Sequence, residues 1–83
     1  MDITKILESA KAVPTSTKLK CWVFEINNSY YHVAECMGYG IPDHASIWTS
    51  SRSGKRISKE PIFTLQLKDY KKCIIKFAES LTD

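Results

Sequence analysis

The alternation of apolar and polar residues along this 83-residue chain predicts two helices separated by several strands. Apolar residues recur at three- and four-residue steps over residues 3–13, at Ile3, Ile6, Leu7, Ala10 and Val13. This spacing places them in one stripe along a helix. Asp2 is a suitable N-cap residue. Pro14 is expected to end the helix, because the residue before a proline is driven out of the α region.

Residues 19–26 and 30–37 predict a β-hairpin, because both are rich in β-branched and aromatic side chains. The turn falls within Asn27-Asn28-Ser29, and asparagine tolerates the positive φ that hairpin turns require. Side chains alternate between the two faces of a strand. One face of the first strand therefore carries Trp22, Phe24 and Ile26, and the other carries Cys21, Val23 and Glu25.

Two registers of this hairpin are chemically reasonable, and the sequence does not choose between them. A turn at Asn27-Asn28 pairs aromatic, apolar and oppositely charged residues: Phe24 with Tyr31, Trp22 with Val33, and Lys20 with Glu35. A turn at Asn28-Ser29 instead places Glu25 opposite His32 and Cys21 opposite Cys36.

The second half of the chain predicts weaker strands and a clear helix. Strands are expected over residues 45–51 and 62–67, with a short one at 56–58, and Phe63, Leu65 and Leu67 should share a face. Glycine, proline and serine mark loops at 14–18 and 38–43 and a turn at 52–55. A helix is expected over residues 69–81, with a buried stripe of Tyr70, Cys73, Ile74, Phe77 and Leu81.

The resulting order, α-β-β-β-(β)-α, predicts a small single α+β domain over residues 1–83. We expect a three- to four-stranded antiparallel sheet flanked by an N-terminal and a C-terminal helix. One face of the sheet should bury both helical stripes, leaving the other partly exposed unless a partner covers it. The chain begins with methionine, and we expect it to be a complete small gene product.

Composition supports a globular domain and shows an uneven distribution of charge. The hydrophobic fraction is 43% and the charged fraction 25%, which excludes a disordered tail. The formal net charge is +3, but the positive charge is concentrated in residues 52–76. This segment contains eight basic residues and only two acidic ones, Glu60 and Asp69. The basic residues are Arg52, Lys55, Arg56, Lys59, Lys68, Lys71, Lys72 and Lys76. Such a surface favours an anionic partner, although a solvated face that keeps the protein soluble is the simpler explanation.

The three cysteines, Cys21, Cys36 and Cys73, are widely spaced and odd in number, which argues against a disulfide framework and a zinc ribbon. The first residues lack the pattern of a signal peptide, and no apolar run approaches the ~18 residues of a membrane span. We therefore expect free thiols, no membrane contact and a cytoplasmic protein.

Motifs for chemistry are missing. His32, His44, Cys21 and Cys36 do not have the spacing of a zinc site. There is no nucleophile elbow, no paired carboxylates at helical spacing, and no complete P-loop around Gly54-Lys55. We expect no catalytic residues, metal or cofactor, and hence no enzyme.

The segment from Ser50 to Arg56 is the clearest candidate for binding, because small residues let a loop approach phosphates that arginine can grip. Trp48 and Tyr39 are candidates for stacking on bases, though core packing is the commoner role of such aromatics. The signatures of RRM and KH domains are absent.

The leading hypothesis is a small non-enzymatic interaction protein that contacts nucleic acid or a nucleoprotein through residues 52–76. The alternative is a protein-binding inhibitor or immunity-type accessory factor, of the kind phages and mobile elements encode, meeting an acidic protein surface. A metal-binding protein or an enzyme subunit is the third and least supported hypothesis. Partner identity and oligomeric state cannot be read from the sequence.

Overall fold

The fold is taken from a computed structural model, which describes residues 2–15, 19–36 and 42–81. Its elements, in chain order, are α1 (Ile3–Ser9), β1 (Lys11–Val13), β2 (Lys20–Ile26), β3 (Ser29–Cys36), β4 (His44–Ser50), β5 (Phe63–Leu65) and α2 (Tyr70–Leu81). Tyr39, together with most of the loop predicted at 38–43 and part of that at 14–18, lies outside the described residues.

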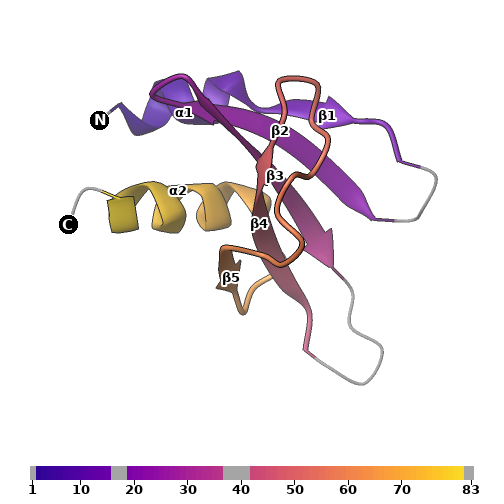
Figure 1. The fold of residues 1–83 in the computed structure, drawn as a ribbon. Helices are drawn as coiled ribbons and strands as arrows, with labels where there is room; N and C mark the ends of the chain where they lie inside the picture. Colours follow the sequence, from indigo (N-terminus) through magenta and orange to yellow (C-terminus); the bar gives the residue numbers. More distant parts are fainter. Residues whose placement is uncertain (1, 16–18, 37–41, 82–83) are drawn as a thin grey trace.

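The strands form one antiparallel sheet in which each strand pairs with its neighbours in the chain, in the order β1-β2-β3-β4-β5. Both helices lie on one side of this twisted sheet (Figure 1). The α+β class is confirmed. The sheet has five strands, however, where three or four were predicted.

The extra strand comes from the end of the predicted first helix, which stops at Ser9 instead of continuing to Val13. The Asp2 side chain caps α1 by accepting from the Lys5 N–H. At the other end the Ser9 hydroxyl donates to the Ile6 carbonyl, and Ala10 is already extended. Residues 11–13, which follow Ala10, pair with β2, so their backbone groups form hydrogen bonds with that strand. At the end of a helix stopped by Pro14, the last carbonyl groups would have no intrahelical partner.

The β2–β3 hairpin has the first of the two predicted registers. Asn27 and Asn28 have φ of 49° and 67°, the left-handed values that a tight two-residue turn requires. Phe24 lies opposite Tyr31 and Lys20 opposite Glu35. The alternative register, with Cys21 opposite Cys36, is wrong.

The main core lies between the helices and the sheet face that carries Phe24, Val33 and Ile47. Phe77 of α2 contacts this face, with its ring centroid 6.4 Å from that of Phe24 and 5.0 Å from that of Tyr31. The buried residues of α2 are Cys73, Ile74, Phe77 and Ala78.

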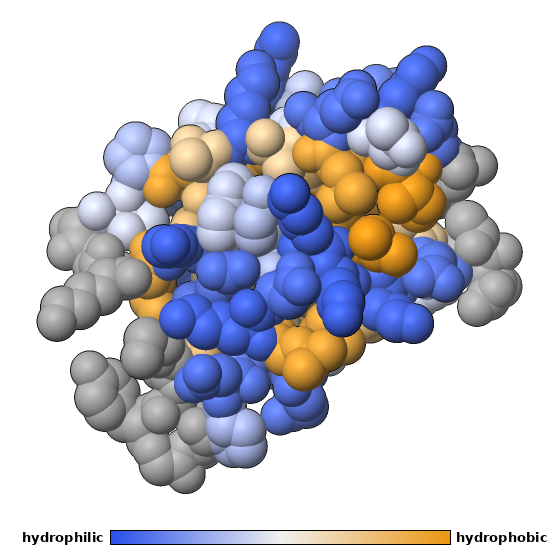
Figure 2. Space-filling model, turned by 180° about the vertical axis from the view of Figure 1, so that it is seen from behind, coloured by the Kyte–Doolittle hydropathy of each residue, from blue (hydrophilic) through white to orange (hydrophobic). Residues whose placement is uncertain are grey.

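Leu81, which was predicted to be buried, is 47% exposed at the end of α2. The strand predicted over residues 62–67 is limited to Phe63–Leu65, so Leu67 lies beyond it and is 51% exposed. Seen from behind, the surface is largely hydrophilic with separate hydrophobic patches (Figure 2).

The second face of the sheet is the one that the helices do not cover. It carries a small buried cluster of Cys21, Ala34 and Trp48, with Val13 and Cys36 packed against it. The connection between β4 and β5 bends back toward β1 on this side, as its contacts with Val13 and Val23 require (Figure 1).

Candidate polyanion-binding surface

Residues 51–59, here called the basic loop, follow β4 and carry Arg52, Lys55, Arg56 and Lys59. The start of the loop is a tight turn closed by its own backbone. The Ser51 N–H donates to the Lys55 carbonyl (2.9 Å), and the Gly54 N–H donates to the Ser51 carbonyl (3.0 Å). The Ser51 hydroxyl also accepts from the Lys55 N–H and bonds to the Ser53 hydroxyl. The small polar residues of this segment therefore order the loop.

The base of the loop is held by a reciprocal pair of hydrogen bonds. The Thr49 N–H donates to the Ser58 hydroxyl (3.2 Å) and the Ser58 N–H donates to the Thr49 hydroxyl (3.1 Å). The strand predicted at 56–58 is reduced to one bridge between Ser50 and Arg56. Backbone bonds form this bridge, including one from the Ile57 N–H to the Thr49 carbonyl (2.8 Å). At Ser58 the bonds to Thr49 pass through hydroxyl groups instead, and the ladder does not continue.

Gly54 anchors the loop to the second face of the sheet. It is buried, with φ of +95°, and a Cβ at this position would lie 2.7 Å from Val13 Cγ2. Its carbonyl is 2.8 Å from Nδ1 of His32, and since a carbonyl only accepts, Nδ1 must carry the hydrogen. Only glycine combines this positive φ with so close an approach to the sheet.

His32 is buried beneath the loop and is neutral at pH 7. Burial lowers the pKa of His32 below its ordinary value, and the nearby Arg56 guanidinium lowers it further. The bond to the Gly54 carbonyl acts on the pKa in the opposite direction. A neutral His32 with a fixed tautomer is thus a structural link between the loop and β3.

Arg56 lies over the ring of Trp48, with its Cζ 4.8 Å from the ring centroid. Trp48 is only 8% exposed, and the ring of His32 meets it edge-on. Trp48 therefore has the packing role, with Arg56 as a cation–π partner on its face. Burial raises the pKa of the thiols of Cys21 and Cys36, and the charge of Arg56 opposes that rise.

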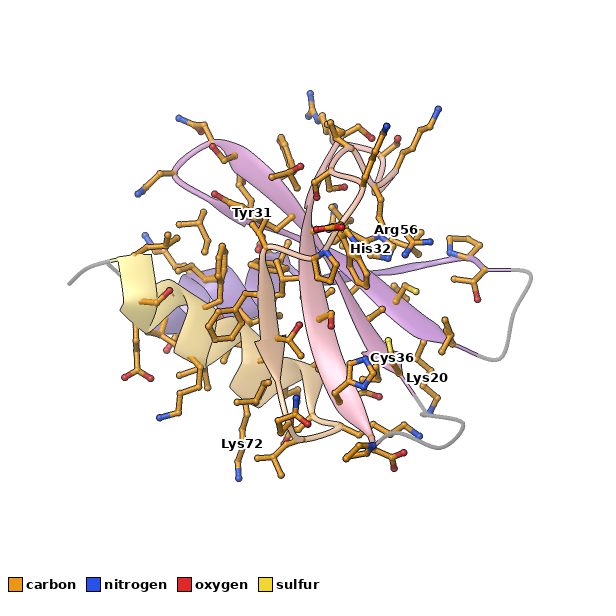
Figure 3. All side chains as sticks on the ribbon, turned by 60° about the horizontal axis from the view of Figure 1, so that its bottom comes forward. Lys20, Tyr31, His32, Cys36, Arg56 and Lys72 are labelled. Atoms are coloured by element: carbon orange, nitrogen blue, oxygen red, sulfur yellow. The ribbon has the colours of Figure 1, made fainter. Side chains whose placement is uncertain are left out.

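The eight predicted basic residues are exposed, but they do not form one surface. Lys71, Lys72 and Lys76 belong to α2, which packs on the first face, and Lys68 precedes it. The basic loop packs on the second face. Figure 3 shows Arg56 beside His32, with Lys72 on the far side of the strands. The loop and the helix therefore present their cations on opposite sides of the sheet.

Within the described part of the chain, none of the four cations of the basic loop forms an ion pair with a carboxylate. Arg56 is partly satisfied by Trp48. Arg52, Lys55 and Lys59 extend into solvent from an ordered backbone, and they are the charges that remain available to a polyanion.

A hollow of about 320 Å³ adjoins the loop, and nothing in the sequence pattern predicted it. Lys11 and Arg52 line it together with Glu25 and Tyr30. Lys11, Glu25 and Tyr30 come from three strands, so the hollow depends on β1, which the helical spacing concealed. The face alternation of β2 and the turn at Asn27-Asn28 are the signals that bring Glu25 opposite Tyr30.

Among residues 2–15, 19–36 and 42–81, no three His, Cys, Asp or Glu side chains are grouped closely enough to hold a metal ion. No helix in that part of the chain is long and apolar enough to cross a bilayer. Comparison of the chain with protein-family models, with curated proteins and with solved structures gave no match.

Proposed function

We propose that this chain is a non-enzymatic interaction protein that binds nucleic acid, free or within a nucleoprotein, through its basic loop. The observation that carries the proposal is the set of uncompensated cations, Arg52, Lys55 and Lys59, on a loop that is ordered before any partner arrives. A preorganised loop loses less conformational entropy on binding. Arginine supplies forked contacts to phosphate, and lysine supplies adaptable point charges.

The proposal is tested by fluorescence anisotropy of labelled single- and double-stranded oligonucleotides over a series of salt concentrations. Each phosphate contact contributes about 0.7–0.9 to the slope of log affinity against log salt. We expect an Arg52→Ala, Lys55→Ala, Lys59→Ala variant to bind more weakly, with a slope reduced by about two to three. Arg56 is left in place because it packs on Trp48.

The matched control is a Lys71→Ala, Lys72→Ala, Lys76→Ala variant, which removes the same charge from the helix on the other face. We expect it to retain the wild-type slope. Equal losses in both variants would mean that net charge alone drives binding. No salt-dependent binding by the wild type at micromolar concentration would refute the proposal.

A second candidate function, a protein-binding inhibitor or accessory factor of phage or mobile-element type, is favoured by two exposed apolar residues, one within the basic loop and one shortly after it. Ile57 is 66% exposed and Ile62 46% exposed, and exposed apolar groups next to charges are typical of protein interfaces. Pull-down from cell extract with wild type and an Ile57→Ser, Ile62→Ser variant tests it. A partner captured only by the wild type supports this candidate, and equal capture by both excludes these residues as its contact.

We further propose a cytoplasmic location. The support is that Cys21, Cys36 and Cys73 are all free, as expected in a reducing compartment.

A further inference from the structure

The hollow beside the basic loop has walls of opposite chemical character. Lys11 and Arg52 supply cations, Glu25 supplies the carboxylate, and Tyr30 supplies a half-buried aromatic ring. A volume of about 320 Å³ is at the lower end of the range for small-ligand sites. The mixture of charges does not suit a simple polyanion, which Glu25 would repel, so the hollow needs a ligand with both an anionic and a hydrogen-donating part.

Glu25 and Tyr30 are placed together by the hairpin register. They are directly opposite each other in the β2–β3 pair and point to the second face, where side chains of such a pair are about 5 Å apart. The backbone of Glu25 is fixed independently, since its N–H donates to the Ser9 hydroxyl (3.0 Å). The strand pairing therefore fixes the backbone positions from which the aromatic ring and the carboxylate extend.

We propose that this hollow binds one unpaired nucleobase, stacked on Tyr30 and hydrogen-bonded to the Glu25 carboxylate, with guanine as the preferred base. Guanine presents neighbouring N–H donors on its Watson–Crick edge, and the two oxygens of a carboxylate can accept both. Lys11 and Arg52 then meet the flanking phosphates, and Arg52 joins the hollow to the basic loop. This inference rests on the proposed nucleic-acid function and narrows its ligand to single-stranded DNA or RNA, because a paired base cannot enter the hollow.

The test compares a short oligothymidylate with the same oligonucleotide carrying one central guanosine, and both with a duplex. We expect the wild type to bind the guanosine oligonucleotide most tightly. Glu25→Gln should reduce the preference for guanosine about tenfold, because the amide offers one acceptor where the carboxylate offers two. Tyr30→Ala should weaken binding of both single strands by about tenfold to a hundredfold, and Tyr30→Phe should retain stacking and bind like the wild type.

Stability is checked by thermal unfolding, and Tyr30→Leu, which keeps apolar bulk without a ring face, replaces Tyr30→Ala if the latter unfolds. Neither substitution should alter duplex binding. The inference is overturned if Glu25→Gln tightens both single strands equally, since the carboxylate would then only repel phosphate. It is also overturned if the folded Tyr30 variants bind as the wild type does. If these results occur while the Arg52, Lys55, Lys59 variant still flattens the salt slope, the proposed function stands; if no nucleic acid binds, both fall.

Discussion

Gly54 is the residue on which the position of the basic loop depends. It combines a buried location, a φ of +95° and a carbonyl bonded to His32. Its neighbour across the gap is Val13, a stiff β-branched side chain of β1 that has little freedom to move aside. The positive φ and the close contact with Val13 therefore both require glycine at this position.

We expect Gly54→Ala to lower the free energy of unfolding by about 1–3 kcal/mol, because alanine is strained at this φ and its Cβ would collide with Val13. Thermal or urea unfolding measures the loss. A Val13→Ala background separates the two causes. Adding Gly54→Ala to it should cost only the part due to φ, because the collision is already removed. A Gly54→Ala protein as stable as the wild type would show that the loop does not pack on β1.

At the scale of elements, the patterns that were readable from the sequence are local ones. The two asparagines of the hairpin turn and the 3.6-residue stripe of α2 depend on residues close together in the chain. The turn is confirmed, and so is the stripe at Cys73, Ile74 and Phe77, but not at Leu81. The sequence did not reveal the strand β1, because Val13 continues the helical stripe that begins at Ile3. Only pairing with β2 shows that residues 11–13 are extended. At residues 11–13, pairing with β2 therefore outweighs the local preference for a helix.

The candidate surface, too, was only partly predictable from the sequence. The basic loop was recognisable from its composition, and its cations are exposed as expected. The sequence did not indicate that the loop and the lysines of α2 lie on opposite faces, because the side of the sheet taken by each segment follows from the whole topology. For the same reason the sequence did not predict that Lys11, Glu25 and Tyr30 line one hollow. Only the pairing of their three strands brings them together.

The packing of α2 is tested by two truncations within the same helix. Phe77 is 5% exposed and its ring contacts Phe24, Tyr31 and Phe63. We expect Phe77→Ala to cost about 3–5 kcal/mol, a large part of the stability of a domain of this size. Leu81→Ala, at a position 47% exposed, should cost less than about 1 kcal/mol. Similar melting temperatures for the two variants would contradict the packing of this helix.

At the scale of the whole molecule, the sheet separates two unequal layers. The helices and the main core lie on one side, while the basic loop and the small cluster around Trp48 lie on the other. The radius of gyration, 11.9 Å, is that of a compact domain of this length. Cys73 lies in the main core, whereas Cys21 and Cys36 lie in the small cluster on the other face, so thiol reactivity measures the solvent exposure of both layers.

We expect thiol titration of the denatured, non-reduced protein to find all three cysteines free. Cys21 lies opposite Ala34, so Cys36 is its diagonal neighbour, at a spacing of about 7–8 Å that is too wide for a disulfide. In the native protein Cys36 should react first because it is half-exposed. Cys73 should react last, since it is fully buried and burial raises its pKa to about 12. Recovery of a single thiol from protein kept free of oxidants would place a bond between Cys21 and Cys36 and contradict the register.

The simple meander of the sheet has a consequence for how the chain is made. Each strand pairs only with those next to it in the sequence, so pairing can begin while the chain is still leaving the ribosome. Of the two helices on the first face, α2 is synthesised only after all five strands. Until it arrives, the part of the face that it covers, with Val33 of β3 and Ile47 of β4, is open to water, and the nascent sheet is at its most vulnerable to aggregation. A chain truncated just before α2 should therefore depend on a chaperone to avoid aggregation, whereas the full chain should not.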